Sequence, residues 1–227
     1  MNKMQKVNLH NHFYKSNHFI VIGPGKISLK DIHPLHKHVG IFTFIDAGLK
    51  HLPKLKKYIS STVPMVSFGD GDSSKSQMTY PKLNQNQSDL AFFLSLMKKN
   101  KIYGLYHFQG FLGGRLDHEL INLGEIIQFI DSIKTPKNNS LAIIEKKILC
   151  LPPGKHKIHL NGIFSIISHV DSNLTLKGHC DFQILKPKIL KSISSQGLSN
   201  KGFGKIEIST NQTVVIIAQK KQDFLKS

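Results

Sequence analysis

The chain has 227 residues, enough for one large domain or two small ones, and its 40% hydrophobic and 20% charged residues are typical of a folded globular protein. No apolar run approaches the length needed to span a bilayer, and the polar N-terminus does not resemble a secretory signal. The two cysteines, Cys150 and Cys180, exclude a disulfide framework, and we expect both to be small buried side chains. These features together predict a cytoplasmic protein.

The charge of the chain is strongly positive, because 31 lysines and arginines outnumber 14 acidic residues and give a formal net charge of +17. The lysines are scattered rather than gathered in a basic arm, and arginine, the usual reader of guanine edges, is nearly absent. A nucleic-acid-binding protein is therefore the weaker interpretation, although it stays open. The same charge would attract an anionic substrate such as ATP.

Short apolar runs in the first half predict buried strands that end in glycine or aspartate. These runs lie at 19–22, 40–45, 63–68, 103–108 and 140–144. The clearest helix between them starts at Asp89, with Ser88 as its N-cap. Alternating strands and helices predict an α/β domain with a mostly parallel sheet, in which ligands bind beyond the carboxyl ends of the strands.

The character of the sequence changes after the polar stretch at 135–139. Short β-branched runs follow, separated by turn formers such as Asn161-Gly162, at 148–151, 163–168, 174–176, 182–185, 205–209 and 213–218. This pattern predicts an all-β sandwich or barrel-like domain. We therefore divide the chain into an α/β domain, 1–138, and a β domain, 139–227, with the strand at 140–144 able to belong to either.

A glycine turn followed by charged residues stands at the centre of the sequence: Gly113-Gly114-Arg115-Leu116-Asp117-His118. The apolar spacing at Leu120, Leu123, Ile127 and Ile130 is helical, and Asp117 is expected to be the N-cap of that helix. Backbone N–H groups, the helix dipole and a guanidinium would then converge on a phosphate group. An ordinary loop before a capped helix explains the hexapeptide alone equally well.

A second set of candidate residues is acidic. Asp70 and Asp72 alternate with glycines, so both side chains can turn to one side of a tight loop and share a hard cation. A simple turn explains this pair alone, but Asp89 and the Arg115 region beyond the next strand favour magnesium with bound phosphate. The histidines at 10, 12, 18, 33, 36 and 38 match no familiar metal site and are expected to be solvated.

At five places, in the same order along the chain, the sequence resembles the thiamine pyrophosphokinase family. The stretch 113–123 is similar to the family's GGRxDHxLxNL signature. The weaker matches are Asp46-Ala47-Gly48 to DGG, Gly69-Asp70-Gly71-Asp72-Ser73 to GDFDS, Ser88-Asp89 to Thr-Asp, and Gly197-Leu198-Ser199-Asn200 to GxSN.

The resemblance implies a homodimeric enzyme that uses Mg²⁺ and transfers diphosphate from ATP to the hydroxyl of thiamine, releasing AMP. Its implied metal ligands are Asp70, Asp72 and Asp89, and its implied catalytic residues are Arg115, Asp117 and Asp72. The implied ATP-binding residues are Asp46, Ser88, Gly113, Gly114, Arg115, His118 and Asn122. The implied thiamine-binding residues are Ser199 and Asn200.

The chain departs from the family pattern at several positions. Gln85 and Asn86 replace the Lys-Asp that usually precedes the Thr-Asp, which removes a cation and a carboxylate from the implied site. Gly71 replaces the phenylalanine of GDFDS, and Ala47 replaces the middle glycine of DGG. A non-catalytic member of the family that binds nucleotide or thiamine is therefore the alternative hypothesis.

Overall fold

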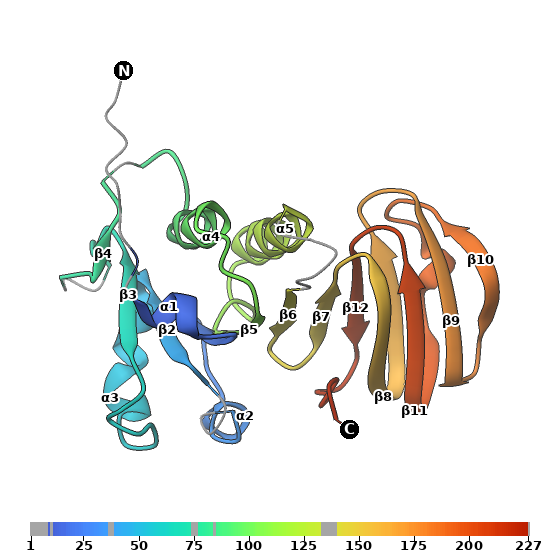
Figure 1. Ribbon diagram of the computed structural model, residues 1–227, viewed down its shortest axis with the longest axis horizontal. Helices are drawn as coiled ribbons and strands as arrows, with labels where there is room; N and C mark the ends of the chain where they lie inside the picture. The colour runs from blue at the N-terminus through green and yellow to red at the C-terminus, as the bar shows by residue number, and fades with distance from the viewer. Residues whose placement is uncertain are drawn as a thin grey trace.

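A computed structural model of the chain describes residues 9, 11–35, 39–73, 77–83, 85–132 and 140–226. Within these residues, twelve strands form one sheet in the order β10-β9-β11-β8-β12-β7-β6-β5-β1-β2-β3-β4 (Figure 1). Parallel pairing joins β1 (His18–Ile22), β2 (Ile41–Ile45), β3 (Met65–Gly69), β4 (Tyr80–Pro81), β5 (Leu105–Gln109) and β6 (Leu141–Ile144). Antiparallel pairing continues through β7 (Ile148–Leu151), β8 (Gly154–Ser168), β9 (Ser172–Cys180), β10 (Ile184–Leu190), β11 (Asn200–Thr210) and β12 (Val214–Ala218).

The predicted fold class is confirmed, since a parallel α/β part precedes an antiparallel β part. Strand β6 pairs with β5 in parallel and with β7 in antiparallel fashion, so it joins the two parts into one hydrogen-bonded sheet. The predicted domain boundary at 138/139 lies outside the described residues.

Helices cover both faces of the parallel part. The longer helices α4 (Asp89–Lys99) and α5 (Leu116–Ser132) lie together on one face, and α2 (Leu29–Ile32) and α3 (Leu52–Leu55) lie on the opposite side (Figure 1). The remaining short elements are α1 (Asn11–Lys15) and the 3₁₀ helices η1 (Asp46–His51) and η2 (Ser195–Gly197).

The strands of the parallel part are mostly apolar, because both faces of the sheet pack against helices, although Thr43, Ser67 and His107 are also buried there. In β1, for example, Phe19 and Val21 belong to the core shared with α4 and α5, whereas Ile20 and Ile22 belong to the core shared with α2 and α3. Because these strands pair in parallel, their carboxyl ends meet at one edge of the sheet.

The start of α4 matches its prediction, and the start of α5 does not. Ser88 caps α4, since its hydroxyl accepts the N–H of Ala91 at 2.9 Å. Helix α5 begins two residues earlier than expected, so Asp117 lies in its first turn instead of at the N-cap. Leu120, predicted to be on the core face of α5, is 61% exposed, because only the C-terminal half of the helix contributes fully buried residues: Ile126, Phe129 and Ile130.

The turn predicted at Asn161-Gly162 is also wrong, because both residues lie inside the long strand β8. Gly162 stands opposite Gly202 in an unbroken ladder with β11. The backbone of Asn161 is bound by the side chain of Gln222, which accepts its N–H at 3.0 Å and donates to its carbonyl at 2.8 Å. Tertiary pairing on both sides of β8 therefore overrides the local turn preference of an Asn-Gly pair.

Both cysteines are buried and free, as predicted. Of the described helices, none combines the length and apolar character that crossing a bilayer requires.

His107 in β5 is a buried titratable side chain, only 5% exposed, whose ring lies 4.7 Å from that of His18, centroid to centroid. His18 is half-buried instead of solvated as predicted, whereas His12 and His33 are exposed, and His10, His36 and His38 lie outside the described residues. Burial, and then the neighbouring charges of His18 and Lys146, lower the pKa of His107 to about 3. An unfolded histidine has a pKa of about 6.5, so protons bind preferentially to the unfolded chain between these two values.

The His107→Leu variant is therefore expected to lose less stability on acidification than the wild type. A depressed histidine pKa removes stability as the pH falls from about 6.5 toward 3, by up to about 1.4 kcal/mol per pH unit. Urea unfolding at stepped pH values measures this slope, with the exposed His12→Leu on α1 as the control. Equal slopes in the His107→Leu protein and the wild type would show that His107 is not the group responsible.

Candidate active site

Three carboxylates from separate segments meet at the carboxyl edge of the parallel sheet. One side-chain oxygen each of Asp46, Asp70 and Asp89 lies within 4.8 Å of the other two. Asp46 directly follows β2, Asp70 directly follows β3, and Asp89 is the first residue of α4. The parallel pairing of β2 with β3 is what brings the first two together. We call these three residues the acidic cluster.

The backbone at this edge is arranged to allow the close approach. Asp46 has a φ of +42°, in the left-handed region that an aspartate tolerates better than most residues. Gly69, at φ +145°, lies against the cluster, where a Cβ atom would stand 3.2 Å from the Cα of Asp46 and 3.3 Å from the Cγ of Asp89. A residue without a side chain is therefore needed at 69 for the carboxylates to converge.

Lys82 contacts the acidic cluster, and nothing in the sequence indicated that this lysine lies there. Its ammonium lies 2.9 Å from Oδ1 of Asp89 and 3.5 Å from Oδ2 of Asp70, and its side chain is only 4% exposed. The residue is held in place because its backbone N–H donates to the carbonyl of Gly69 at 2.8 Å, next to the short strand β4. A two-residue strand has too little periodicity to be recognised, so its neighbour could not be placed.

The surroundings shift the pKa values of Asp70, Asp89 and Lys82 in different directions. The amide of Gln85, followed by the backbone N–H of Asp72, holds the pKa of Asp70 down at about 2. Burial raises the pKa of Asp89, even though the ammonium of Lys82 opposes this effect. Burial alone would lower the pKa of Lys82, but its hydrogen bond and charge contact with Asp89 outweigh burial and raise that pKa.

The cluster fits a magnesium ion. Oδ1 of Asp46 is buried and has no hydrogen-bond partner among the described residues, which is costly unless a cation satisfies it. Carboxylate oxygens are the ligands that this hard ion prefers. The three ligands supported by the geometry are therefore Asp46, Asp70 and Asp89.

Asp72, predicted from the sequence as a metal ligand and catalytic residue, has a different position. Its carboxylate is exposed and accepts the hydroxyl of Ser73 at 2.9 Å. Its backbone N–H donates to Oδ1 of Asp70 at 3.2 Å, so the loop uses Asp72 to orient Asp70. The geometry therefore places Asp46, which the resemblance assigned to ATP, among the three carboxylates, and it leaves the carboxylate of Asp72 outside them.

Gln85 and Asn86, which replace the family's Lys-Asp before Ser88, have different surroundings. Gln85 donates from its amide nitrogen to Oδ2 of Asp70 at 2.9 Å, whereas Asn86 is exposed. Gln85 therefore contacts the same carboxylate as Lys82. The position keeps a hydrogen-bond donor to the acidic cluster, without the charge.

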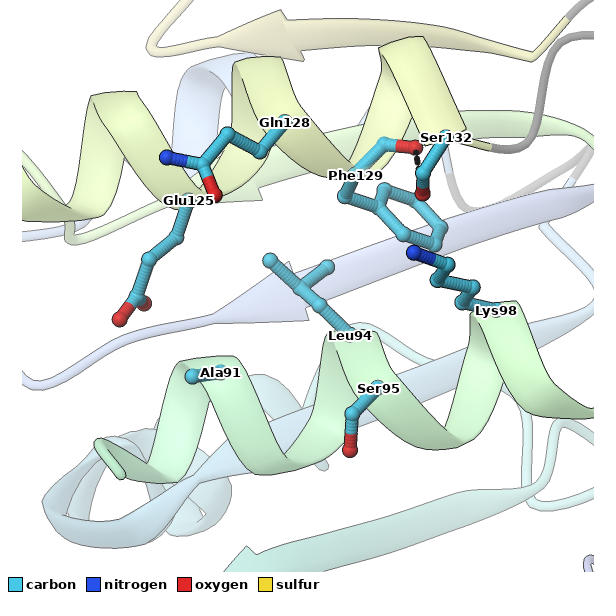
Figure 2. A pocket seen from close by; sticks show the side chains of 8 residues that line it. All are labelled: Ala91, Leu94, Ser95, Lys98, Glu125, Gln128, Phe129 and Ser132. Carbon is cyan, nitrogen blue, oxygen red and sulfur yellow. Dashed lines mark hydrogen bonds between the residues drawn. The ribbon is translucent and has the colours of Figure 1, made fainter. Parts of the chain in front are cut away.

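Glu125 on α5 holds the start of α4, and sequence reasoning missed it. Both of its carboxylate oxygens accept the hydroxyl of Ser88, at 3.0 and 2.9 Å. Figure 2 shows Glu125 at one end of a pocket between the two helices, reaching toward α4, with Lys98 at the other end. Burial raises the pKa of Glu125, and Ser88 partly offsets this. The contact fixes α5 against the residue that precedes Asp89.

The glycine turn at 113–114 has its donors occupied by a carboxylate of the same chain. Oε1 of Glu119 accepts the N–H groups of Gly113 at 2.8 Å and of Gly114 at 2.6 Å. Arg115 pairs with Asp117 at 2.6 Å, with both side chains exposed. The turn therefore binds an anionic group at the start of α5, and Glu119 occupies the place where the predicted external anion would bind.

His118 and Asn122 are the other two ATP-binding candidates on this helix. His118 is exposed and Asn122 is half-buried. A cavity of about 520 Å³ adjoins the turn, and its lining includes Lys26, Lys147 and Lys221. Glu119 and Glu145 also line this cavity, so cations and carboxylates face it together.

The thiamine-binding candidates lie in the antiparallel part. Ser199 is exposed, has a φ of +60°, and donates its N–H to the hydroxyl of Ser165 at 3.2 Å. Asn200 is buried, and its amide both donates to the carbonyl of Phe182 at 2.7 Å and accepts that residue's N–H at 3.1 Å. The Asn200 amide therefore fastens β11 to the segment before β10.

Models of protein families and curated proteins give no match to the sequence. Solved structures do. The thiamine pyrophosphokinase from Bacillus subtilis is 20% identical, with a TM-score of 0.66 over 89% of this chain and 100% of that one. The Candida albicans thiamin pyrophosphokinase is 14% identical, with a TM-score of 0.66 over 91% and 90%. The yeast enzyme is 13% identical, with a TM-score of 0.59 over 95% and 91%.

The chain therefore has the fold of the thiamine pyrophosphokinases, over most of its length and over nearly the whole of each of these proteins. The resemblance noted in five short motifs is confirmed at the level of the fold.

Proposed function

We propose that the protein is a thiamine diphosphokinase, which transfers diphosphate from ATP to the hydroxyl of thiamine and releases AMP. The observation that supports this most directly is the acidic cluster of Asp46, Asp70 and Asp89 at the carboxyl edge of a sheet with the thiamine pyrophosphokinase fold. In such sheets, ligands bind at this edge. The positive charge of the chain favours an anionic substrate.

Asp46, Asp70 and Asp89 would hold Mg²⁺, which supplies charge neutralisation for the phosphate oxygens when it is bound. The substrate hydroxyl attacks the β-phosphorus, a new P–O bond forms, and the bond to AMP breaks. Because the protein does little covalent work in such a transfer, its residues act by positioning and by charge. Asp72 serves in this scheme by orienting Asp70.

The residues at the start of α5 would act on the nucleotide. The N–H groups of Gly113 and Gly114 would bind a phosphate, and Arg115 would offset charge on the transferring oxygens. Asp117, paired with Arg115, would orient this region or take the hydroxyl proton. Ser88, His118 and Asn122 complete the proposed ATP-binding set.

Ser199 and Asn200 are the proposed thiamine contacts, and the proposed assembly is a homodimer. Support for the dimer comes from large apolar side chains that the antiparallel part leaves exposed in a single chain: Phe182, Leu185, Ile189, Ile193, Leu198 and Phe203. Exposed apolar groups in this number are typical of an interface. Light scattering during size-exclusion chromatography measures the assembly.

The decisive experiment is to incubate the protein with ATP, Mg²⁺ and thiamine and to measure AMP and thiamine diphosphate. Formation of both products in equal amounts is expected. If neither forms across a range of divalent metals, the proposed reaction is wrong.

A non-catalytic binding protein of the same fold is the second candidate. Gln85 and Asn86 favour it, because they remove a charged pair from the neighbourhood of Asp70. Calorimetry separates the two functions, since binding of ATP or thiamine without AMP formation supports the second.

Retention on DNA that changes little between low and moderate salt would argue against a nucleic-acid binder, because phosphate contacts weaken steeply with salt.

The Glu119→Gln variant is expected to lower the KM for ATP by about fivefold with little change in kcat. A charged acceptor holds an N–H donor about 1 kcal/mol more strongly than a neutral one, so the amide competes less with a phosphate for the glycine turn. Steady-state kinetics measure this, with Glu207→Gln on β11 as the control. A raised KM would mean that the turn does not bind the nucleotide.

A further inference from the structure

We propose that Lys82 is a built-in cation of the acidic cluster and that it limits the site to one divalent ion. The proposal rests on the metal-binding part of the proposed function and adds a residue outside the sequence motifs. It also gives the stoichiometry of the metal.

The ammonium of Lys82 occupies a position that suits a cation. It contacts Oδ1 of Asp89 at 2.9 Å and Oδ2 of Asp70 at 3.5 Å, which are two of the three carboxylates of the cluster. Its third contact is the carbonyl of Gln87 at 3.0 Å. These three contacts are all with oxygen atoms, the ligands that a hard metal ion also prefers.

The charges of the site then leave room for a single divalent ion. Asp46, Asp70 and Asp89 carry three negative charges when ionised, and Lys82 contributes one positive charge, so the cluster has a net charge of −2. One divalent ion neutralises this charge, whereas a second would be repelled by the first and by the ammonium. Without Lys82, the same carboxylates would attract cations more strongly.

The ammonium is held in this position by burial. The side chain is only 4% exposed, and the backbone N–H of Lys82 donates to the carbonyl of Gly69. A buried ammonium that loses its partners leaves an uncompensated charge, which is strongly unfavourable. Lys82 therefore stays with the carboxylates as a positioning residue, and it sets their charge for the metal.

Position 85 allows the positive charge of Lys82 to be restored by a second substitution. Its amide nitrogen lies 2.9 Å from Oδ2 of Asp70, the same oxygen that Lys82 approaches. A lysine at 85 can therefore return an ammonium to the cluster from a different position in the chain.

The experiment measures Mn²⁺ binding to the whole protein without substrates. Calorimetry gives the affinity and stoichiometry, and electron paramagnetic resonance measures the free Mn²⁺. The wild type is expected to bind one Mn²⁺ per chain. Lys82→Met should tighten Mn²⁺ binding by roughly tenfold or more, because a repelling charge is removed. The double variant Lys82→Met/Gln85→Lys should return the affinity toward that of the wild type, and the exposed Lys57→Met should leave it unchanged.

Whether Lys82→Met tightens or weakens Mn²⁺ binding distinguishes an electrostatic role of Lys82 from a structural one. Loss of a merely structural lysine would disorder the carboxylates and weaken Mn²⁺ binding, and that result would overturn the proposal. Two ions per wild-type chain would overturn it even if Lys82→Met does not fold. If the wild type binds one Mn²⁺ as described but forms no thiamine diphosphate, the reaction fails and Lys82 keeps its role. If no Mn²⁺ binds, both fail.

Discussion

The Asp46→Asn variant is expected to lose Mn²⁺ binding and to lower diphosphate transfer by roughly 10²–10³-fold, the usual effect of losing one group that stabilises charge in a transition state. Oδ1 of Asp46 is buried and has no hydrogen-bond partner in the described part of the chain. Asparagine keeps the size of the side chain and also tolerates the left-handed backbone at this position. The loss should therefore come from the missing charge, without unfolding.

The matched comparison is Asp72→Asn, which changes an exposed carboxylate two residues after Asp70. Its backbone N–H, the group that contacts Asp70, is retained, so Mn²⁺ affinity should change much less than in Asp46→Asn. Calorimetric titration and AMP formation measure both variants. A larger loss in Asp72→Asn than in Asp46→Asn would show that the sequence motif identifies the ligand better than the geometry does.

Gly69→Ala is expected to destabilise the protein by about 1–3 kcal/mol and to weaken Mn²⁺ binding in the same variant. The backbone φ of +145° is unfavourable for an alanine, and the added methyl would press on Asp46 and Asp89 from 3.2 and 3.3 Å. Moving either residue separates the carboxylates. Urea unfolding and Mn²⁺ titration measure the two effects.

Gly124→Ala is the control for this substitution. Gly124 lies within α5, and nothing stands within 4 Å of the position of its Cβ. Alanine in a helix is more stable than glycine by up to about 1 kcal/mol, so this variant should gain stability and bind Mn²⁺ normally. Equal stabilities of the Gly69→Ala protein and the wild type would mean that the site does not depend on the glycine.

The sequence was sufficient to predict that acidic side chains gather at one edge of the sheet, because strand ends can be recognised locally. Buried runs that stop at Asp46 and Asp70, and a capped helix that starts at Asp89, each have a clear pattern. Parallel pairing then requires their ends to share one edge. The fold class follows from the same reasoning.

The individual roles within the site could not be predicted, because they depend on side-chain direction and on non-local pairing. Asp72 lies beside Asp70 in the sequence but points to Ser73, whereas Asp46 comes from another strand and points inward. Lys82 reaches the site only because two residues of β4 pair with β3. Leu120 is exposed because only the C-terminal half of α5 packs into the core, and helical spacing does not show where along a helix the packing begins.

The pairing of β6 with both β5 and β7 has a consequence for catalysis. A hinge rotation of the parallel part against the antiparallel part would have to break the backbone hydrogen bonds between β6 and β7. Ala142, Ile143 and Ile144 pair with β7 there in register. For the proposed reaction, we therefore expect substrates to be captured by segments at the rim of the sheet, such as the loops after β3 and β5, and not by a rotation of the two parts.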